Sequence, residues 1–437
     1  MPVNPETTSL SVLDMARRGQ FEEIHGRFAP GLRTLLTADA IRTAWTTEID
    51  RLGPVRSVGT PVSEEVRPGV LVIKVPVRCE HDGMTFVVTM TAAGELAGLQ
   101  LAPAEVNEPA PAWEPPSYAD RATFDERDVT VGSGPLAVPG TMTVPCGSGP
   151  RPGIVLLSGS GPNDRDGTLG RNRILRDIAW GLATRGIAVL RFDKVTHAHR
   201  AECASDEGLT IVDEYVPHAI AAVRLLQAQP TVDPRRVFVL GHSLGGTVAP
   251  RVAAADASIA GLVLLAGGAQ PMHWAAVRQV RYLASLDPAT AAAVAPMIET
   301  MTRQATTIDG PDLSPSTPPA DLPFGVPPAY WLDLRAYDPA ATAATLDTPI
   351  LVLQGGRDYQ VTLADDLARW ETALAGRPGV KIRVFPADNH FFFPGTGPSS
   401  PAELEPAQHV DEAVIEEIAG WLRGVAAWTD WEAGAPA

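Results

Sequence analysis

The stretch Val237-Phe238-Val239-Leu240-Gly241-His242-Ser243-Leu244-Gly245-Gly246 joins an apolar, β-branched run to a glycine-rich turn. The apolar run predicts a buried strand, and the small residues at 247–255 predict a helix directly after the turn. Gly241 and Gly245 leave room for two backbones to approach closely beside Ser243. A serine on such a strand-to-helix turn has an exposed hydroxyl, which is the typical position of a nucleophile. A nucleophilic serine also needs a base, an acid and an oxyanion site, and these have to come from the rest of the chain.

Strand and helix patterns alternate on both sides of this turn. Predicted helices at 172–184, 212–229, 247–255 and 361–374 lie between strand-like runs. This alternation predicts an α/β fold with an eight-stranded, mostly parallel sheet and helices on both faces. In such a sheet the functional residues gather at the carboxyl ends of the strands. The predicted strands are Asp128–Val131, Gly140–Val144, Gly153–Leu157, Ile187–Arg191, Val237–Leu240, Gly261–Ala266, Pro349–Gln354 and Val380–Phe385.

Two histidines compete for the role of the base. A serine hydroxyl is a poor nucleophile at neutral pH, so it needs a histidine that is oriented by a carboxylate. At a turn of this kind the acid follows the serine along the chain, and the histidine follows the acid. His390 comes shortly after the predicted strand 380–385, which places it at the carboxyl edge of the sheet. His409 opens an amphipathic C-terminal helix, where a surface or capping role is sufficient. We therefore predict that His390 is the base.

The acid is expected in the loop after the preceding strand, 349–354. Asp358 lies in that loop. Asp388 is close to His390 in the chain, but it follows the wrong strand for this order. The predicted catalytic residues are therefore Ser243, Asp358 and His390, with Asp388 as the alternative acid.

The tetrahedral intermediate of acyl transfer needs two backbone N–H donors. Leu244, the residue after the nucleophile, supplies the first of them. The second comes from the glycine-rich loop 158–164 after the third predicted strand. Because Pro162 has no N–H, the donor must precede it. We expect Ser160 to be this oxyanion donor, with Gly161 as the alternative.

Residues 267–339 separate two predicted strands by far more than one crossover helix requires. Long insertions at the active-site end of a sheet act as lids or as walls of the substrate site. This cap insertion contains predicted helices at 274–286 and 289–307, followed by a proline-rich run. Its aromatic residues either line the substrate pocket or form the core of the insertion itself. The candidate substrate contacts are Trp274, Tyr330 and Trp331 in the insertion, with Tyr282 and Phe324 as further aromatic candidates, and Gly161 and His242 outside it.

The first 102 residues differ in pattern from the rest of the chain. Apolar stripes up to residue 52 predict helices, and alternating runs at 70–77 and 84–90 predict antiparallel strands. Residues 1–102 are therefore expected to form a small α+β domain, to which we assign packing or dimerisation. The proline-rich residues 103–119 form a linker, and residues 120–437 form the catalytic domain.

Six short motifs in the predicted catalytic domain carry a family resemblance. From about Phe124 onwards the chain resembles bacterial α/β-hydrolases of the serine carboxylesterase or dienelactone-hydrolase-like type. The resemblance implies an α/β-hydrolase fold and a triad of Ser243, Asp358 and His390. The motifs are Ser-Gly-Ser-Gly-Pro-Asn-Asp-Arg-Asp-Gly (158–167), Leu-Arg-Phe-Asp-Lys (190–194), Gly-His-Ser-Leu-Gly-Gly (241–246), Tyr-Trp-Leu-Asp-Leu (330–334), Gln-Gly-Gly-Arg-Asp-Tyr-Gln-Val (354–361) and Asp-Asn-His (388–390).

A second resemblance concerns the first domain. The apolar residues from Phe21 to Leu99 occur in a succession similar to that of a small domain found ahead of some bacterial α/β-hydrolases. That domain has a cystatin-like or NTF2-like α+β shape and no known function. The resemblance implies the same shape for residues 1–102.

Two positions depart from the pattern of the family. Ser158 stands where these enzymes usually have a histidine before glycine, but it precedes the expected donor, so the predicted oxyanion site is unaffected. The run 193–199 differs from the usual Lys-Arg continuation and contains His197 and His199. These two histidines either contact substrate or are solvated, and no third ligand for a metal is apparent in the sequence.

The composition limits the partners. A net charge of −16 argues against nucleic acid and anionic membranes as partners, because phosphate binding needs clustered Lys and Arg. The three cysteines are far apart and form no Cys-x-x-Cys pair, so neither a disulfide framework nor a zinc site is expected. The N-terminal residues have neither the basic nor the apolar region of a signal peptide, which predicts a cytoplasmic protein.

Together these features predict a serine hydrolase that cleaves a carboxylic ester of a small or medium-sized organic substrate through an acyl-enzyme. This chemistry needs no cofactor and no metal. The same triad serves thioesterases, lactonases and acyltransferases, which stay open as alternatives, and a non-catalytic ligand-binding relative is the alternative of another class. The expected partner is a small-molecule ester, and a homodimer through the first domain or the cap is a further expectation.

Overall fold

The computed structural model describes residues 5–33, 36–67, 70–91, 94–103 and 113–433. The chain divides into two units, Met1–Pro111 with Pro288–Thr300 and Ala112–Asp287 with Met301–Ala437. Most of the predicted linker, residues 104–112, lies outside the described residues. The predicted catalytic domain also includes residues 288–300, so the prediction and this division differ there.

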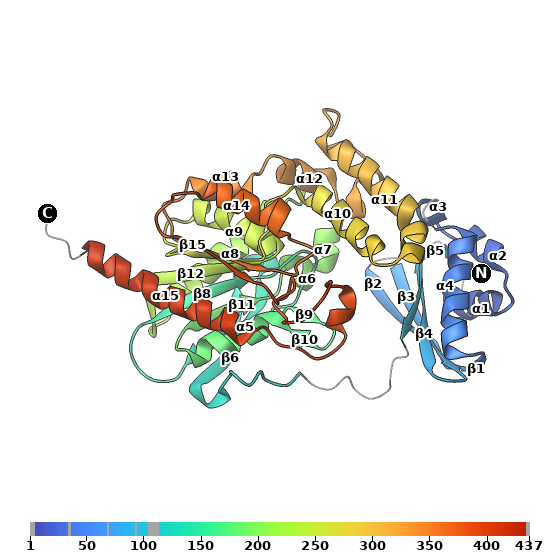
Figure 1. Cartoon of the computed structure of the whole chain (residues 1–437), viewed down its shortest axis with the longest axis horizontal. Coiled ribbons are helices and arrows are strands. Elements are labelled where there is room, and N and C mark those ends of the chain that lie inside the picture. Colours follow the sequence, from blue (N-terminus) through green and yellow to red (C-terminus); the bar gives the residue numbers. More distant parts are fainter. Residues whose placement is uncertain (1–4, 34–35, 68–69, 92–93, 104–112, 434–437) are drawn as a thin grey trace. The chain divides into compact units, whose positions relative to one another are not determined.

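The described part of the first unit contains an antiparallel sheet and helices (Figure 1). The sheet order is β1-β3-β4-β5, and β2 also pairs with β3. Alternate side chains of β3, from Ile73 to Cys79, are buried because successive residues of a strand point to opposite faces. The expected α+β architecture is confirmed, whereas its cystatin-like or NTF2-like type stays a prediction. The elements are α1 (Pro5–Arg17), α2 (Phe21–Gly26), α3 (Pro30–Arg33), α4 (Ala38–Leu52), β1 (Val55–Val58), β2 (Val62–Arg67), β3 (Val70–Cys79), β4 (Gly83–Thr91) and β5 (Leu96–Pro103).

The sequence pattern does not predict β1 and β2. The middle residues of β1, Arg56 and Ser57, are exposed, and in β2 the residues Val62, Ser63 and Glu64 are all exposed. Neither strand therefore shows the alternation of buried and exposed residues that marks a half-buried strand. Both strands form by antiparallel pairing with β3, which is a contact that a local pattern does not encode.

In the described part of the second unit, eight strands form one sheet with the order β15-β14-β13-β12-β8-β11-β7-β6. Neighbours from β15 to β11 are parallel, whereas β7 is antiparallel to both β11 and β6. Each predicted strand corresponds to one of these, so the predicted eight-stranded, mostly parallel sheet is confirmed. The strands are β6 (Phe124–Val131), β7 (Val138–Pro145), β8 (Arg151–Leu157), β11 (Ala188–Phe192), β12 (Val232–His242), β13 (Leu262–Leu265), β14 (Ile350–Gly355) and β15 (Val380–Phe385).

Helices cover both faces of this sheet (Figure 1). The helices α5 (Ile174–Thr184) and α15 (Glu412–Ala433) bury apolar residues against one face, and α8 (Ile211–Gln227) and α9 (Leu244–Ala255) against the other. The strands β8, β13 and β14 are buried on both sides, which explains their continuous apolar runs. Shorter elements of this unit are β9 (Thr168–Leu169), β10 (Asn172–Arg173), α6 (Val195–Ala198), α7 (Arg200–Ser205) and α14 (Ala368–Ala373).

The cap insertion lies between β13 and β14. It contains α10 (Met272–Ser285), α11 (Pro288–Asp309), α12 (Pro328–Arg335) and α13 (Pro339–Ala344), of which α10 and α11 correspond to the two predicted helices. Its later part has a small apolar core formed by Ile308, Leu313, Leu322 and Trp331.

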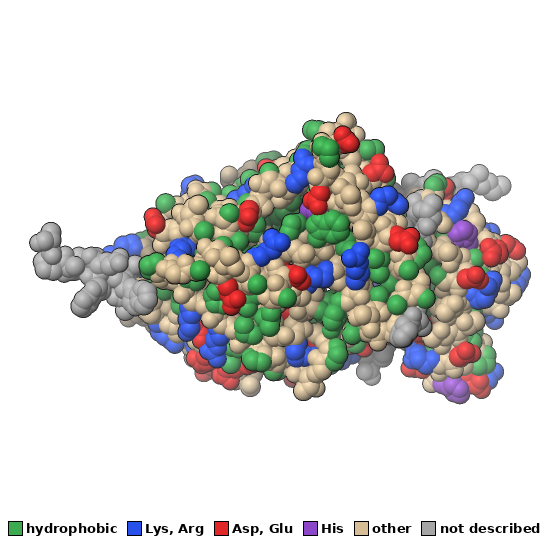
Figure 2. Space-filling model, turned by 45° about the horizontal axis from the view of Figure 1, so that its top comes forward, with side chains coloured by type: hydrophobic (Ala, Val, Ile, Leu, Met, Phe, Trp, Pro, Cys, Tyr) green, Lys and Arg blue, Asp and Glu red, His purple; other side chains and the backbone are tan. Residues whose placement is uncertain are grey.

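Charged side chains of both signs lie next to one another over the second unit, as Figure 2 shows. Ion pairs also join elements of this unit: Arg185 lies 2.8 Å from Glu412 and 2.7 Å from Glu416, which joins the end of α5 to α15. None of the helices in the described part of the chain is both long enough and apolar enough to cross a bilayer.

The backbones of β12 and α9 approach each other closely at the turn formed by residues 241–246. A Cβ atom on Gly241 would lie 2.1 Å from the carbonyl oxygen of Gly245, and one on Gly245 would lie 2.6 Å from that of Leu157. These distances are far below van der Waals contact, so only glycine fits. Gly246 approaches Gly267 in the same way, with a Cβ contact of 2.8 Å to its Cα. The glycines therefore bring the ends of β8, β12 and β13 together.

Replacing Gly241 by alanine is expected to destabilise the protein by at least about 2 kcal/mol, because the added methyl group overlaps fixed backbone atoms. Gly420→Ala is the matched control: an added Cβ there meets no atom within 4 Å, and the residue lies exposed within α15. This second change is expected to stabilise by about 0.5–1 kcal/mol through helix propensity. Urea unfolding of both variants measures the difference, and equal midpoints for the two would contradict the steric argument.

Candidate active site

Ser243 stands at the junction of β12 and α9, at the carboxyl edge of the sheet. Its backbone has φ 54° and ψ −120°, a conformation that costs energy in a residue other than glycine. Its N–H donates to the carbonyl of Leu265 in β13 (2.9 Å), and its carbonyl accepts from the N–H of Thr247 (3.0 Å). These bonds hold the strained turn, and the half-buried side chain of Ser243 lines two cavities.

The carboxylate of Asp358 lies against the imidazole of His390. Asp358 Oδ2 is 2.7 Å from His390 Nδ1, and both side chains are buried. Oδ1 accepts from the backbone N–H groups of Gln360 (2.7 Å) and Val361 (2.9 Å). Gln354 Nε2 donates to Oδ2 (2.9 Å). An ionised carboxylate held in this way requires the proton on Nδ1 of His390, which leaves Nε2 available as a base.

Ser243 and His390 line the same cavity. Within the described chain the Ser243 hydroxyl makes no hydrogen bond. Of the two hydrogen bonds that join the residues of the predicted triad, the structure contains the one between Asp358 and His390. The bond between a nucleophile and its base often tightens only when substrate binds. The structure thus brings the three predicted residues to one edge of the sheet.

The rival candidates lie in other surroundings. His409 Nδ1 is 3.1 Å from Asp177 Oδ2, and neither residue lines either of the two cavities described for Ser243. Asp388 is buried, and neither of its carboxyl oxygens has a hydrogen-bond partner in the described chain. His390 pairs with Asp358 instead. Asp388 is therefore a buried acid outside the hydrogen-bonded pair.

His242 supports the backbone of His390. Its Nε2 lies 3.0 Å from the carbonyl oxygen of His390, and the two rings are 4.9 Å apart. Burial and the nearby His390 lower the pKa of His242 to about 3, so the ring is neutral at neutral pH and donates from Nε2. His242 also lines the smaller of the two cavities, and its contact with substrate stays a prediction.

The backbone amides beside Ser243 point to an oxyanion site. In the described chain the N–H groups of Leu244, Ser160 and Gly161 have no hydrogen-bond acceptor. Ser160 and Leu244 both line the larger cavity together with Ser243. Gly159 fits beside the nucleophile because a Cβ there would lie 3.1 Å from Ser243 Cβ. The arrangement suits the predicted pair of donors and leaves Gly161 as the alternative to Ser160.

The carbonyl groups of the same loop are held from the opposite side. Asn163 Nδ2 donates to the carbonyls of Gly159 (3.0 Å) and Ser160 (2.8 Å). Lys194 Nζ and the Tyr215 hydroxyl also donate to Gly159 O, at 3.1 and 2.8 Å. With the carbonyls fixed in this way, the amide N–H groups are left for a ligand. The motif residues Asn163 and Lys194 thus have a role that their positions in the sequence do not reveal.

Lys194 is fully buried and needs compensation for its charge. Burial lowers the pKa of Lys194, and the carboxylate of Glu214, 2.9 Å away, opposes this shift. Glu214 also accepts from the hydroxyls of Thr196 (2.9 Å) and Tyr330 (2.7 Å). Tyr330, a candidate substrate contact, therefore belongs to the network that holds loop 158–164, which we call the oxyanion loop because it carries the predicted donor Ser160.

The first helix of the cap, α10, forms hydrogen bonds with the loop that carries Asp358. Arg278 of α10 donates to the carbonyls of Tyr359 (3.3 Å) and Gln360 (3.0 Å), and it pairs with the buried Asp366 (3.0 Å). The ring of Tyr282, also in α10, stacks on that of Tyr359 at 4.8 Å. Because Asp358 accepts its backbone hydrogen bonds from this loop, α10 helps to fix the position of the acid.

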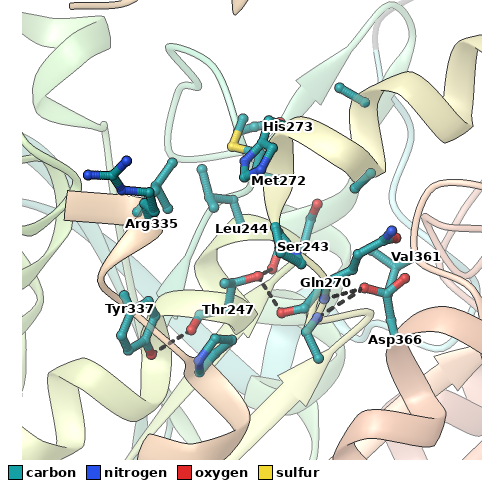
Figure 3. Close-up of a pocket in the computed structure, with 18 of the residues that line it drawn as sticks. Ser243, Leu244, Thr247, Gln270, Met272, His273, Arg335, Tyr337, Val361 and Asp366 are labelled. Carbon is teal, nitrogen blue, oxygen red and sulfur yellow. Dashed lines mark hydrogen bonds between the residues drawn. The ribbon is translucent and has the colours of Figure 1, made fainter. Parts of the chain in front are cut away.

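The larger cavity, about 370 Å³, lies between Ser243 and the cap (Figure 3). In Figure 3, Met272 of α10 lies above Leu244 and Ser243, and Tyr337 lies beside Thr247. The Tyr337 hydroxyl donates to the carbonyl of Thr247 (2.8 Å). The smaller cavity, about 170 Å³, lies on the side of His390. Its lining includes Ser160, Leu169, Ile174, Leu175, His242, Ser243, His390 and Phe391.

The predicted substrate contacts in the cap do not line either of these cavities. Trp331 is fully buried in the core of the insertion, and Trp274 Nε1 donates to Asp309 (2.6 Å). Gly161 and Tyr330 are likewise absent from both linings, whereas the further candidate Phe324 lines the larger cavity. Contact with substrate by these residues stays a prediction.

The two histidines of the 193–199 run bond to backbone carbonyls. His197 Nδ1 lies 3.2 Å from the oxygen of Pro162, and His199 Nε2 lies 2.8 Å from that of Ala137. In the described chain no group of three or more His, Cys, Asp or Glu side chains has the arrangement of a metal site.

Comparison with known proteins identifies the family. A model of the alpha/beta hydrolase family matches residues 154–420. Esterase EstD from Thermotoga maritima is 40% identical over 337 residues, which cover 77% of this chain and 76% of that protein. The chain therefore belongs to the α/β-hydrolase family, and the resemblance drawn from its motifs is confirmed.

The solved structures that are similar to this chain have low sequence identity to it. An esterase from Pyrococcus furiosus, PF2001, is 17% identical with a TM-score of 0.44, covering 69% of this chain and 91% of that one. Est1E from Butyrivibrio proteoclasticus is 15% identical with a TM-score of 0.45, covering 69% and 99% of the two chains.

Arg278→Ala is expected to lower kcat about 10- to 100-fold. The variant loses the contacts of Arg278 with Tyr359, Gln360 and Asp366, and a small displacement of Asp358 slows the reaction. Arg281→Ala is the matched control on the same helix, since Arg281 is exposed and, among the described residues, donates to Thr302 in the cap (3.1 Å) rather than to the loop that carries Asp358. Steady-state kinetics with p-nitrophenyl acetate measure both variants. Equal kcat values for the two variants would show that the hydrogen bonds from α10 to the loop that carries Asp358 have no catalytic effect.

Asp388→Asn is expected to change how stability depends on pH. Burial and the nearby Asp411 raise the pKa of Asp388 from 3.8 to about 7, while Arg357 opposes the shift. Between these two values the folded protein keeps a proton that the unfolded chain releases, so wild-type stability falls as the pH rises towards 7. The asparagine variant lacks this loss, so it gains stability relative to wild type from pH 4 to 7. Urea unfolding at several pH values measures the difference, and a constant difference would refute the assignment.

Proposed function

We propose that this member of the α/β-hydrolase family hydrolyses carboxylic esters, with Ser243 as nucleophile, His390 as base and Asp358 as the orienting acid. The observation that carries the proposal is the short Asp358–His390 contact, 2.7 Å, at the wall of the cavity that Ser243 also lines. The likeness to Esterase EstD, at 40% identity over most of both chains, supports the same reaction class.

In the first half of the reaction, His390 Nε2 takes the proton of the Ser243 hydroxyl while its oxygen attacks the ester carbonyl carbon. The negative charge that develops on the carbonyl oxygen is bound by the N–H groups of Leu244 and Ser160. The imidazolium of His390 is stabilised by Asp358. It then protonates the oxygen of the leaving alcohol as the carbon–oxygen bond breaks, which leaves an acyl group on Ser243.

In the second half, water replaces the alcohol. His390 takes a proton from the water, whose oxygen attacks the acyl carbon, and the same two amides bind the oxyanion. Collapse of this intermediate returns the proton to Ser243 and releases the carboxylic acid. The sum is one ester and one water converted to one acid and one alcohol. Thioester, lactone and acyl-transfer chemistry use the same groups and stay alternatives to ester hydrolysis.

Removing the negative charge of Asp358 and that of Asp388 is expected to lower kcat by amounts that differ by orders of magnitude. Asp358→Asn is expected to lower kcat about 10⁴-fold, because the amide favours the wrong tautomer of His390. Asp388→Asn, a buried acid outside the pair, is expected to change kcat less than tenfold. Steady-state hydrolysis of p-nitrophenyl acetate by both variants measures this, and the reverse order would make Asp388 the catalytic acid.

The nucleophile is tested by covalent labelling. Wild-type protein is expected to react with a fluorophosphonate probe at Ser243, whereas Ser243→Ala is expected to lose labelling and about 10⁶-fold in kcat. Circular dichroism checks that the variant is folded. A wild-type protein that is folded and unlabelled, and that turns over none of the esters, would support the non-catalytic alternative.

A further inference from the structure

We propose that the larger cavity under the cap binds the acyl part of the substrate and that the smaller cavity beside His390 binds the leaving alcohol. The preferred substrates are then esters of medium-sized carboxylic acids with small, uncharged alcohols. This inference rests on the proposed function and names the substrate class of the same site.

The assignment of the alcohol follows from where the proton must go. The leaving oxygen receives its proton from His390, so the alcohol has to lie on the histidine side of the carbonyl carbon. His390 lines the smaller cavity and is absent from the lining of the larger one. Ser243 and Ser160 line both, as expected for groups that bond to the carbonyl carbon and its oxygen. The acyl chain is therefore directed to the larger cavity.

The volumes set the size of each group. A cavity of about 150 Å³ holds one benzene ring, so about 170 Å³ accommodates an alcohol no larger than one ring or a short alkyl chain. About 370 Å³ is within the range of sites that bind small organic molecules. The acyl group is thus the larger part of the substrate.

The two walls also differ in how readily they can change. The smaller cavity is bounded by Ile174 and Leu175, the first two residues of α5, which are 5% and 1% exposed and belong to the packed core. Such residues have little freedom to move apart. The wall of the larger cavity includes Met272 and Ala276, which are half-buried residues of the cap helix α10. The alcohol site is therefore the stricter of the two.

The chemistry of the smaller cavity favours an uncharged alcohol. Besides the catalytic groups its wall contains apolar residues (Leu169, Ile174, Leu175 and Phe391) and uncharged polar residues (Ser158, Asn163 and Gln360), and it contains no Lys, Arg, Asp or Glu among the described residues. A charged alcohol would lose its hydration there without gaining a partner.

Two ester series separate the cavities. Acyl length is varied in p-nitrophenyl acetate, butanoate and octanoate, and alcohol size is varied in the methyl, benzyl and 2-naphthylmethyl esters of hexanoic acid. Wild-type enzyme is expected to have a higher kcat/KM for the octanoate than for the acetate. It is expected to have a kcat/KM at least tenfold lower for the 2-naphthylmethyl than for the benzyl ester.

Two matched variants each fill one cavity. Ala276→Phe is expected to lower the octanoate-to-acetate ratio of kcat/KM at least tenfold while the benzyl-to-methyl ratio stays within threefold. Leu169→Phe is expected to lower the benzyl-to-methyl ratio of kcat/KM at least tenfold while the octanoate-to-acetate ratio stays within threefold. Leu169 is a half-buried residue of β9 that lines the smaller cavity. Each variant is the control for the other, and fluorophosphonate labelling of Ser243 shows that both are folded.

The outcomes separate this inference from the proposed function. If Ala276→Phe changes the alcohol ratio and Leu169→Phe changes the acyl ratio, the two groups bind the other way round and the inference is overturned. Unchanged ratios in both variants also overturn it, because the cavities then hold neither group. In both cases ester hydrolysis itself stands. A labelled wild type that hydrolyses no ester, or an unlabelled one, overturns the proposed function and the inference together.

Discussion

The close approach of three backbones around Ser243 is the constraint on which the catalytic unit depends. Gly241 and Gly245 meet at distances that no Cβ atom tolerates, and Gly246 meets Gly267 in the same way. The end of β8, the start of α9 and the loop after β13 therefore share one contact. These segments carry the loop with the proposed oxyanion donor, the proposed nucleophile and the first residues of the cap. The location of the site is thus determined by backbone packing before any side chain contributes to it.

Much of the second unit and of its site could be predicted from the sequence because the signals there are local. The strands β8, β13 and β14 are short apolar runs, and each member of the proposed triad follows a predicted strand within a few residues. Parallel strands bring their carboxyl ends to one edge, so the order of Ser243, Asp358 and His390 along the chain was enough to place them together. The spacing alone does not determine the hydrogen bonds, such as those that Gln354 and Val361 make to Asp358.

The remaining features depend on contacts between residues far apart in the chain. The aromatic residues of the cap carry no signal that separates a pocket wall from a core, and Trp331 is in the core. The support of the oxyanion loop requires Lys194, Glu214 and Tyr330 to meet from three elements. The strands β1 and β2 form by pairing with β3 and have no apolar alternation of their own. In each case the tertiary partner decides the role of the residue.

The hydrogen bonds from Arg278 to the carbonyls of Tyr359 and Gln360 limit how far the cap can change in evolution or in redesign. A cap that only covers a site can be exchanged for another without loss of chemistry. Here the first cap helix also supports the acid loop, so α10 is the part of the insertion least free to diverge. Changes in substrate range are therefore expected to accumulate in the later cap segments, or at α10 positions such as Ala276 that line the cavity without touching the loop.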